Sequence, residues 1–304
     1  MKLSLITDEV SQDLDTAGAE LRPAGQPMSV MTPSVPTAIQ AFDLQGSDAS
    51  PLPGVGRRAF QVGAFVLKFV GKEAHEPTVA WLAELFSRLP SKDFRVPRPI
   101  QSRCGNWIWD GWIAMEWLPG SSRQGEWATK VAASRALHAA IGDAVLPVSF
   151  EPNNGVWARA DRAAWGEERI AIHPELQPLV EPLLERRVAV TAMPQLIHGD
   201  LSRANFLLHA GRPPAIIDFA PYLRPSGLAL AIMAVDEAAW YGADLQVFDQ
   251  VPAIEHWDQM LLRAAVMRLV GLQELAKLHP GWNWLGEVAG LRPVVRAIAG
   301  RLDT

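Results

Sequence analysis

The stretch LIHGDLSRANFLLHAGRPPAIIDF, residues 196–219, decides the fold of the chain. A short apolar run leads into His-Gly-Asp, which ends at Asp200, and Asn205 follows five positions later. A second apolar run ends at Asp218. Burying a carboxylate beside apolar strands is costly unless a partner or a metal compensates. One aspartate that takes a proton, with an asparagine and a second aspartate that hold Mg²⁺, is what phosphoryl transfer from a nucleotide requires.

The segment HGDLSRAN, residues 198–205, fits the catalytic-loop pattern His-x-Asp-x-x-x-x-Asn of kinases. Its HGDL opening resembles the form used by the aminoglycoside phosphotransferase and choline kinase-like family, and Asp218 stands where that family has its metal-binding aspartate. The resemblance extends from about Ala38 to the C-terminus. It implies a two-lobed protein kinase-like fold of the α+β class, in which a small antiparallel-sheet lobe precedes a mainly helical lobe.

The resemblance also implies a role for each polar residue of the loop. Asp200 becomes the catalytic base for the acceptor hydroxyl, and Asn205 and Asp218 become ligands of Mg²⁺. His198 is expected to brace the loop, and Arg203 could reach the transferred phosphoryl group. The residues alone leave plainer alternatives open, since Asp200 could cap a turn and Arg203 could point to solvent. The implied phosphoryl donor is ATP or another nucleoside triphosphate.

A glycine-rich hairpin is predicted upstream of this loop. Gly54 and Gly56 precede two strands, residues 59–62 and 65–70, and glycines let backbone N–H groups approach phosphate oxygens closely. Lys68 then follows on the second strand, where kinases carry the lysine that binds the α- and β-phosphates. The alternative is an ordinary turn followed by a solvated lysine.

Two further segments would complete a nucleotide site. Residues 73–88 are predicted to form a helix that begins near Pro77, and Glu84 is our candidate for the carboxylate that orients the lysine, with Glu76 as the other choice. A site without this ion pair is also compatible with the sequence. By resemblance, the backbone of one segment binds the adenine, and its residues are Met115, Glu116, Trp117 and Leu118.

The strands and helices around these segments follow from local patterns. A strand is expected over residues 96–101, and residues 106–109 and 112–117 are expected to pair across a turn at Asp110-Gly111. Apolar residues at helical spacing predict the later helices. Their ranges are 127–141, 158–165, 174–187, 226–240, 256–279 and 285–302.

Length and composition restrict the class of protein. A chain of 304 residues with 49% hydrophobic and 20% charged residues can bury a large core. Its net charge of −5 argues against a nucleic-acid partner, whose binding surface would be basic, and leaves room for a cationic small molecule. The single Cys104 excludes an internal disulfide, and no apolar run reaches the ~20 residues of a membrane helix. We therefore expect a cytoplasmic protein without a membrane partner.

Three regions are expected along the chain. Residues 1–33 form a leader or appended segment, residues 34–118 the nucleotide-covering lobe, and residues 119–304 the catalytic lobe. Residues 1–17 resemble the opening of a sugar-phosphate isomerase barrel, but nothing later continues the eight units that such a barrel needs. Three phrases of the second lobe resemble an actinobacterial branch of phosphotransferase-like proteins: DRAAW at 161–165, APYLRP at 220–225 and QMLLRA at 259–264.

The chain departs from the family pattern after Asp218. Family members place acidic residues at positions filled here by Pro221, Ser226 and Leu230, and the last of these normally ties the catalytic loop to the next helix. Asp236 could compensate. These losses leave open a nucleotide-binding protein with weak or no turnover, whereas an enzyme that phosphorylates protein side chains is disfavoured because no activation-loop segment follows.

The acceptor is expected to be a small molecule with a hydroxyl group. Acidic and aromatic residues gather in the expected substrate region, and they could bind an amine or a quaternary ammonium group. They are Asp236, Glu237, Trp240, Tyr241 and Asp244. The alternative is that the aromatic residues belong to the core.

Overall fold

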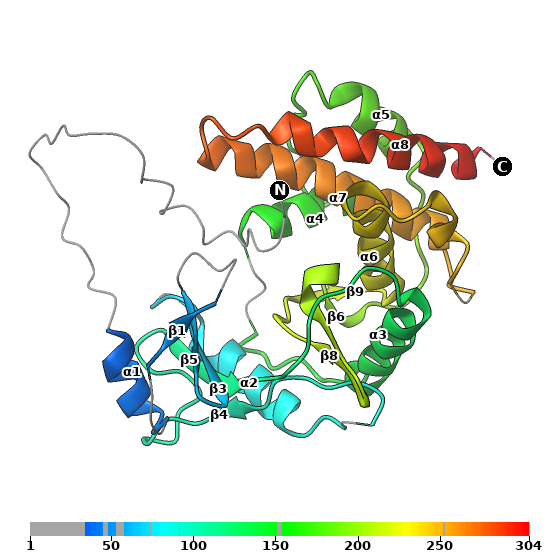
Figure 1. Ribbon diagram of the computed structural model, residues 1–304. Coiled ribbons are helices and arrows are strands. Elements are labelled where there is room, and N and C mark those ends of the chain that lie inside the picture. The colour runs from blue at the N-terminus through cyan, green and yellow to red at the C-terminus, as the bar shows by residue number, and fades with distance from the viewer. Residues whose placement is uncertain are drawn as a thin grey trace, which may run out of the picture. The chain divides into compact units, whose positions relative to one another are not determined.

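The computed structural model of the chain describes residues 34–44, 48–52, 58–72, 74–90, 92–150, 154–251 and 253–303 (Figure 1). The expected leader 1–33 and the glycines Gly54 and Gly56 lie outside the described residues. The described chain has the expected α+β composition and divides into two compact units. The first contains the described residues up to Arg88 together with Pro97–Trp117, and the second contains Leu89–Val96 and the chain from Leu118 onward.

The first unit is built on an antiparallel sheet of order β1-β2-β3-β5-β4. Its elements are α1 (Val35–Ala41), β1 (Ser50–Pro51), β2 (Ala59–Val62), β3 (Phe65–Phe69), α2 (Glu76–Ser87), β4 (Pro99–Ile100) and β5 (Trp112–Glu116). The predicted hairpin of β2 and β3 is present, and α2 begins beside Pro77 as its sequence indicates. The expected strand 96–101 is reduced to Pro99–Ile100, because Pro97 and Pro99 cannot donate to a ladder.

One face of this sheet carries the core of the first unit. Val62, Leu67 and Trp112 pack there against Ala38 and Phe42 of helix α1 and its C-cap. Side chains alternate between the two faces of a strand, so Lys68, the neighbour of Leu67, projects from the opposite face.

The expected turn before β5 has the backbone that its residues favour. Asp110 and Gly111 have φ angles of 47° and 83°, as a type I′ hairpin turn requires. An isolated bridge joins Trp109 and Trp112 across this turn, and residues 106–109 do not form the expected strand.

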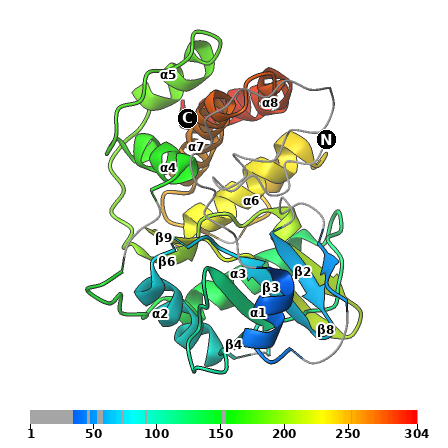
Figure 2. The ribbon, with the colours of Figure 1, turned by 90° about the vertical axis from the view of Figure 1, so that its left-hand side faces the viewer.

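The second unit is mainly helical, and two helices contribute the largest share of its buried apolar residues. Helices α6 (Gly227–Trp240) and α7 (Trp257–Leu278) are buried along most of their lengths, and α7 runs beside α8 (Trp284–Leu302) in both views (Figures 1 and 2). The remaining elements are α3 (Trp127–Ile141), α4 (Val156–Trp165), α5 (Gln177–Glu185), β6 (Gln195–His198), η1 (Arg203–Asn205), β7 (Phe206–His209), β8 (Arg212–Ile216), β9 (Pro221–Arg224) and η2 (Leu245–Phe248).

Two antiparallel strand pairs in this unit carry the motif loop. β6 pairs with β9, and β7 pairs with β8. Every pair of named strands in the described chain is antiparallel, which is incompatible with the parallel barrel suggested by residues 1–17. Within the described ranges, no helix combines the length and hydropathy that crossing a membrane requires.

Candidate active site

His198 ties the motif loop to the strand end that carries Asp218. Its ring is fully buried, and burial lowers its pKa, so the imidazole is neutral. Nδ1 accepts the N–H of Asp200 at 3.2 Å, and Nε2 then carries the proton and donates to the carbonyl of Ile217 at 3.1 Å. The ring therefore fixes the backbone on both sides of the site and has no exposed nitrogen for proton transfer.

Gly199 is required because the ring of Tyr222 on β9 lies against it. A Cβ at this position would come within 2.0 Å of Tyr222 Cδ2. The N–H of Gly199 donates to the carbonyl of Ala220 at 2.8 Å, which continues the pairing of β6 with β9 to the start of the loop. Close packing thus explains the middle residue of His-Gly-Asp.

Asn205 is buried and links the loop to both acidic residues. Its Nδ2 donates to the carbonyl of Asp200 at 2.7 Å and to Asp200 Oδ2 at 3.3 Å. Its own carbonyl accepts the N–H of Ile217 at 3.0 Å, next to Asp218. The side-chain Oδ1 is buried and has no hydrogen-bond partner among the residues that the structure describes, which is costly for a polar atom unless a ligand completes it.

Asp218 occupies a strained position after β8. Its φ of 55° lies in the left-handed region, which aspartate tolerates better than most residues and which is common at functional sites. The described residues contain no group of three or more His, Cys, Asp or Glu side chains placed to hold a metal. A cation here would therefore depend on the oxygens of Asn205 and Asp218 and on ligands from a nucleotide or water. Such a mixed oxygen set suits Mg²⁺.

The carboxylate of Asp200 accepts a hydrogen bond from an arginine that was not expected from the sequence. Arg268 of α7 donates from Nη2 to Asp200 Oδ1 at 3.0 Å, and through Nη2 and Nε to both carboxylate oxygens of Asp236 at 2.7 and 2.8 Å. Arg268 and Asp236 are buried, whereas the side chain of Asp200 remains 34% exposed. The predicted compensation by Asp236 therefore operates through an arginine. The available signal was a charged residue within the apolar run of α7, because a buried charge needs a partner.

Arg203 points toward helix α6. It donates to Glu237 from Nη2 at 2.7 Å and to the carbonyl of Tyr241 at 3.0 Å, and its guanidinium lies 4.1 Å from the centre of the Tyr241 ring. Lys130 of α3, fully buried, donates to the same Glu237 at 2.7 Å. Arg203 is therefore engaged within the second unit.

The remaining candidates are the lysine, the glutamate and the adenine-binding segment that were expected to complete a nucleotide site. Lys68 is on β3, and Glu84 is on the exposed side of α2. In the adenine-binding candidate segment, the N–H of Glu116 donates to the carbonyl of Arg98 and that of Trp117 to the carbonyl of Ala64, both at 2.8 Å. Met115 is on β5, and the buried Leu118 opens the second unit.

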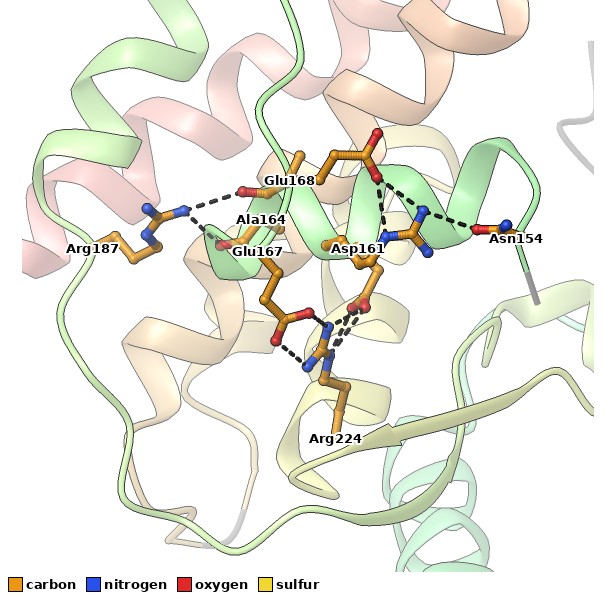
Figure 3. Close-up of polar contacts among 9 residues, drawn as sticks. Asn154, Asp161, Ala164, Glu167, Glu168, Arg187 and Arg224 are labelled. Carbon is orange, nitrogen blue, oxygen red and sulfur yellow. Dashed lines mark hydrogen bonds and ion pairs between the residues drawn. The ribbon is translucent and has the colours of Figure 1, made fainter. Parts of the chain in front are cut away.

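Strand β9 is anchored to helix α4 by a partly buried arginine. Figure 3 shows Arg224 between Asp161 and Glu167, with nitrogen–oxygen distances of 2.7 Å to each carboxylate. Its guanidinium lies 4.8 Å from the centre of the Trp165 ring, and that of Arg263 lies 4.5 Å from it. The phrases DRAAW, APYLRP and QMLLRA thus meet at one place, where they position the strand that pairs with β6.

Comparison with protein families gives one match to the chain. Residues 48–223 match the sequence model described as the phosphotransferase enzyme family. This range covers more than half of the 304 residues and includes the motif loop and Asp218. Comparison with curated proteins gives no significant match.

Solved structures of low sequence identity share the fold. The amicoumacin kinase hAmiN, in complex with AMP-PNP, Ca²⁺ and Ami, aligns with a TM-score of 0.59 at 14% identity, over 88% of this chain and 92% of that one. The choline kinase LicA from Streptococcus pneumoniae aligns at 0.56 and 12%, and the GDP complex of aminoglycoside 2'-phosphotransferase-IIIa at 0.56 and 17%, each over 88% of this chain and 98% of the other. The expected kinase-like fold is confirmed.

Proposed function

The chain belongs to the phosphotransferase enzyme family, and from that premise we propose that it transfers the terminal phosphoryl group of ATP to a hydroxyl group of a small molecule with the help of Mg²⁺. One observation carries this proposal. The amide of Asn205 holds Asp200 with its nitrogen, while its buried Oδ1 has no partner in the described part of the chain. An oxygen left unpaired beside a partly exposed carboxylate suits a bound cation next to a general base.

In the proposed mechanism, Asp200 accepts the proton of the acceptor hydroxyl and aligns its oxygen for attack on phosphorus. Asn205 and Asp218 would hold Mg²⁺, and Lys68 would bind the α- and β-phosphates. When bound, the ion neutralises charge on the phosphates. His198 and Arg268 keep the carboxylate of Asp200 in place by hydrogen bonds to its backbone and side chain. The rate enhancement would come from positioning and electrostatics.

The second candidate is a nucleotide-binding protein with weak or no turnover. Two observations favour it: Glu84, the expected partner of Lys68, is exposed on α2, and Leu230 stands at the position of a family aspartate. The link from Asp236 through Arg268 to Asp200 opposes it, because it supplies another attachment for the catalytic carboxylate.

Replacing Asp200 separates the two candidates. For the proposed enzyme, Asp200→Asn should reduce Mg²⁺-dependent ATP consumption by about 10²-fold or more and keep the thermal shift caused by ATP and Mg²⁺. Asp143→Asn, which removes an exposed carboxylate after α3, is the matched control and should retain turnover. If the Asp200 variant consumes ATP as fast as the wild-type protein, the assignment of the base is wrong. Nucleotide binding with no consumption in the wild type would favour the second candidate.

A further inference from the structure

We propose that the acceptor of this enzyme is an uncharged polyhydroxyl compound, such as a sugar or a polyol, and that the site does not select for a cation. This inference rests on the proposed function and concerns its second substrate. The sequence suggested amine recognition by acidic and aromatic residues near the end of α6. Their contacts in the folded chain argue against that role.

Glu237 is neutralised from two sides. Its carboxylate accepts Lys130 Nζ at 2.7 Å and Arg203 Nη2 at 2.7 Å, and it is 3% exposed. A substrate amine would have to displace one of these cations and leave it without a carboxylate in a buried place. Breaking a buried ion pair by removing one partner is strongly unfavourable, so Glu237 is unsuited to bind a substrate cation.

Asp236 is neutralised in the same manner. Both of its oxygens accept hydrogen bonds from Arg268, which also reaches Asp200. Asp244 lies at the surface, where its side chain accepts the N–H of Gln246 at 2.8 Å and caps η2. The three acidic residues that predicted an amine therefore have structural partners.

The aromatic residues are engaged as well. Arg203 lies over the ring of Tyr241 at 4.1 Å, where a quaternary ammonium group would otherwise stack. Trp240 donates its indole N–H to the carbonyl of Glu287 at 3.0 Å and is partly covered. A cation–π site on the face of Tyr241 that Arg203 covers would need Arg203 to move away from both Tyr241 and Glu237.

The charges around Asp200 also balance, so this region does not favour an anionic substrate. The three carboxylates of Asp200, Asp236 and Glu237 face the three cations Lys130, Arg203 and Arg268, so the formal charge of the group is zero. The phenol of Tyr241 is neutral at physiological pH, and burial raises its pKa further, to about 12. Tyr241 and Asp200 are both partly exposed, and a substrate hydroxyl group can hydrogen-bond to a phenol and to a carboxylate.

Acceptor binding can be tested with pairs of compounds of similar shape, one neutral and one cationic. The probes are glucose with glucosamine, and 3,3-dimethyl-1-butanol with choline, titrated into full-length protein with and without AMP-PNP and Mg²⁺ and followed by ligand-observed NMR. We expect the wild-type protein to bind the cationic member no more tightly than its neutral partner. The double variant Arg203→Met/Lys130→Met removes both cations from Glu237, and it should raise the affinity for the cationic member about tenfold relative to the neutral one.

The outcomes are distinct from those that test the proposed function. A wild-type preference of about tenfold or more for the cations, lost in Glu237→Gln, would overturn the inference. It would also be overturned if the double variant folded and gained no cation affinity, because a neutralised Glu237 would then not be the cause. Failure of the proposed function would appear in the nucleotide experiments, whereas the charge ranking can be read without nucleotide.

Discussion

At the scale of the residue, the motif loop is organised by a bridging arginine. Arg268 reaches Asp200 with one nitrogen and Asp236 with two, from a helix far along the chain. Burial raises the pKa of Asp236 to about 6, because desolvation outweighs the favourable effect of Arg268. Asp236 is therefore a buried carboxylate whose charged form depends on the ion pair with Arg268.

Replacing Arg268 alone should lower the free energy of unfolding more than replacing Arg268 and Asp236 together. Arg268→Met leaves Asp236 buried without its cation, and we expect a loss of about 3–5 kcal/mol in the free energy of unfolding. Arg268→Met combined with Asp236→Leu should recover most of that loss, because two apolar side chains need no partners. Urea denaturation at pH 7 measures both proteins. Equal losses in the single and double variants would contradict this account.

His138 gives a prediction for pH. It is buried, donates to the carbonyl of Ser134 and accepts the N–H of His198, and burial lowers its pKa from 6.5 to about 4. A histidine with a depressed pKa in the folded state stabilises the protein above pH 6.5, and this contribution falls as the pH drops toward 4. From pH 8 to pH 5 the loss should be about 2 kcal/mol.

The change can be isolated by comparing His138→Gln with the wild-type protein. Denaturation curves at several pH values from 8 to 5 should show a smaller decline in stability for the variant, whatever its stability at pH 8. His198 also has a depressed pKa and is present in both proteins, so the comparison isolates the titration of His138 together with its electrostatic coupling to His198. Parallel declines would show that His138 does not titrate between the folded and unfolded states as described.

The motif residues could be predicted from the sequence, whereas the groups that hold them could not. Asp200, Asn205 and Asp218 lie within 19 positions of each other, so local patterns place them together. Lys130 and Arg268 approach from helices that are distant in sequence, and only tertiary packing brings them to the site. Their signal was weak, because a charged residue in a predicted helix is usually assigned to its solvent face.

At the scale of the element, close helix packing makes one glycine indispensable. Gly271 of α7 faces the ring of Trp157 on α4, and an added Cβ would come within 2.1 Å of Trp157 Cζ3. Gly271→Ala should therefore lower the free energy of unfolding by about 1–3 kcal/mol through overpacking. Gly300→Ala in α8 is the matched control, since a Cβ there meets nothing within 4 Å.

The control variant should behave oppositely. Alanine has the higher helix propensity, so Gly300→Ala should stabilise by up to about 1 kcal/mol. Thermal denaturation of the two variants beside the wild-type protein gives both signs in one experiment. Stabilisation by both substitutions would mean that α4 and α7 can separate without cost.

Helices were more predictable than strands. The helix over Trp127–Ile141 matches the expected range, because its apolar spacing is regular and local. The strand Pro221–Arg224 was not expected, since PYLR begins with proline and has no alternating apolar pattern. That strand is determined by pairing with β6 and by the ion pairs of Arg224, which are contacts between distant segments.

At the scale of the whole molecule, the proposed ligands should stabilise the folded chain. The candidates for nucleotide contact lie in the first unit and at its end, and those for the metal lie in the second. A ligand that binds only the folded state stabilises it by about 2.7 kcal/mol at 100 times its dissociation constant, which for a chain of this size raises the melting temperature by roughly 4 °C. ATP with Mg²⁺ should produce such a rise, and ATP with EDTA a smaller one.

The variant Asn205→Ala tests whether this rise in melting temperature depends on a cation bound at the motif loop. Asn205→Ala removes the buried Oδ1, which has no partner within the described ranges, so the variant should lose most of the difference between ATP with Mg²⁺ and ATP with EDTA, while the effect of ATP alone persists. Asn106→Ala, at an exposed asparagine in the first unit, is the matched control and should keep the full Mg²⁺-dependent rise. Because the shift is measured within each protein, any loss of stability in the variant itself does not affect the comparison. An undiminished Mg²⁺-dependent rise in Asn205→Ala would place the cation away from this loop, and the absence of any nucleotide effect in the wild-type protein would contradict the proposed function itself.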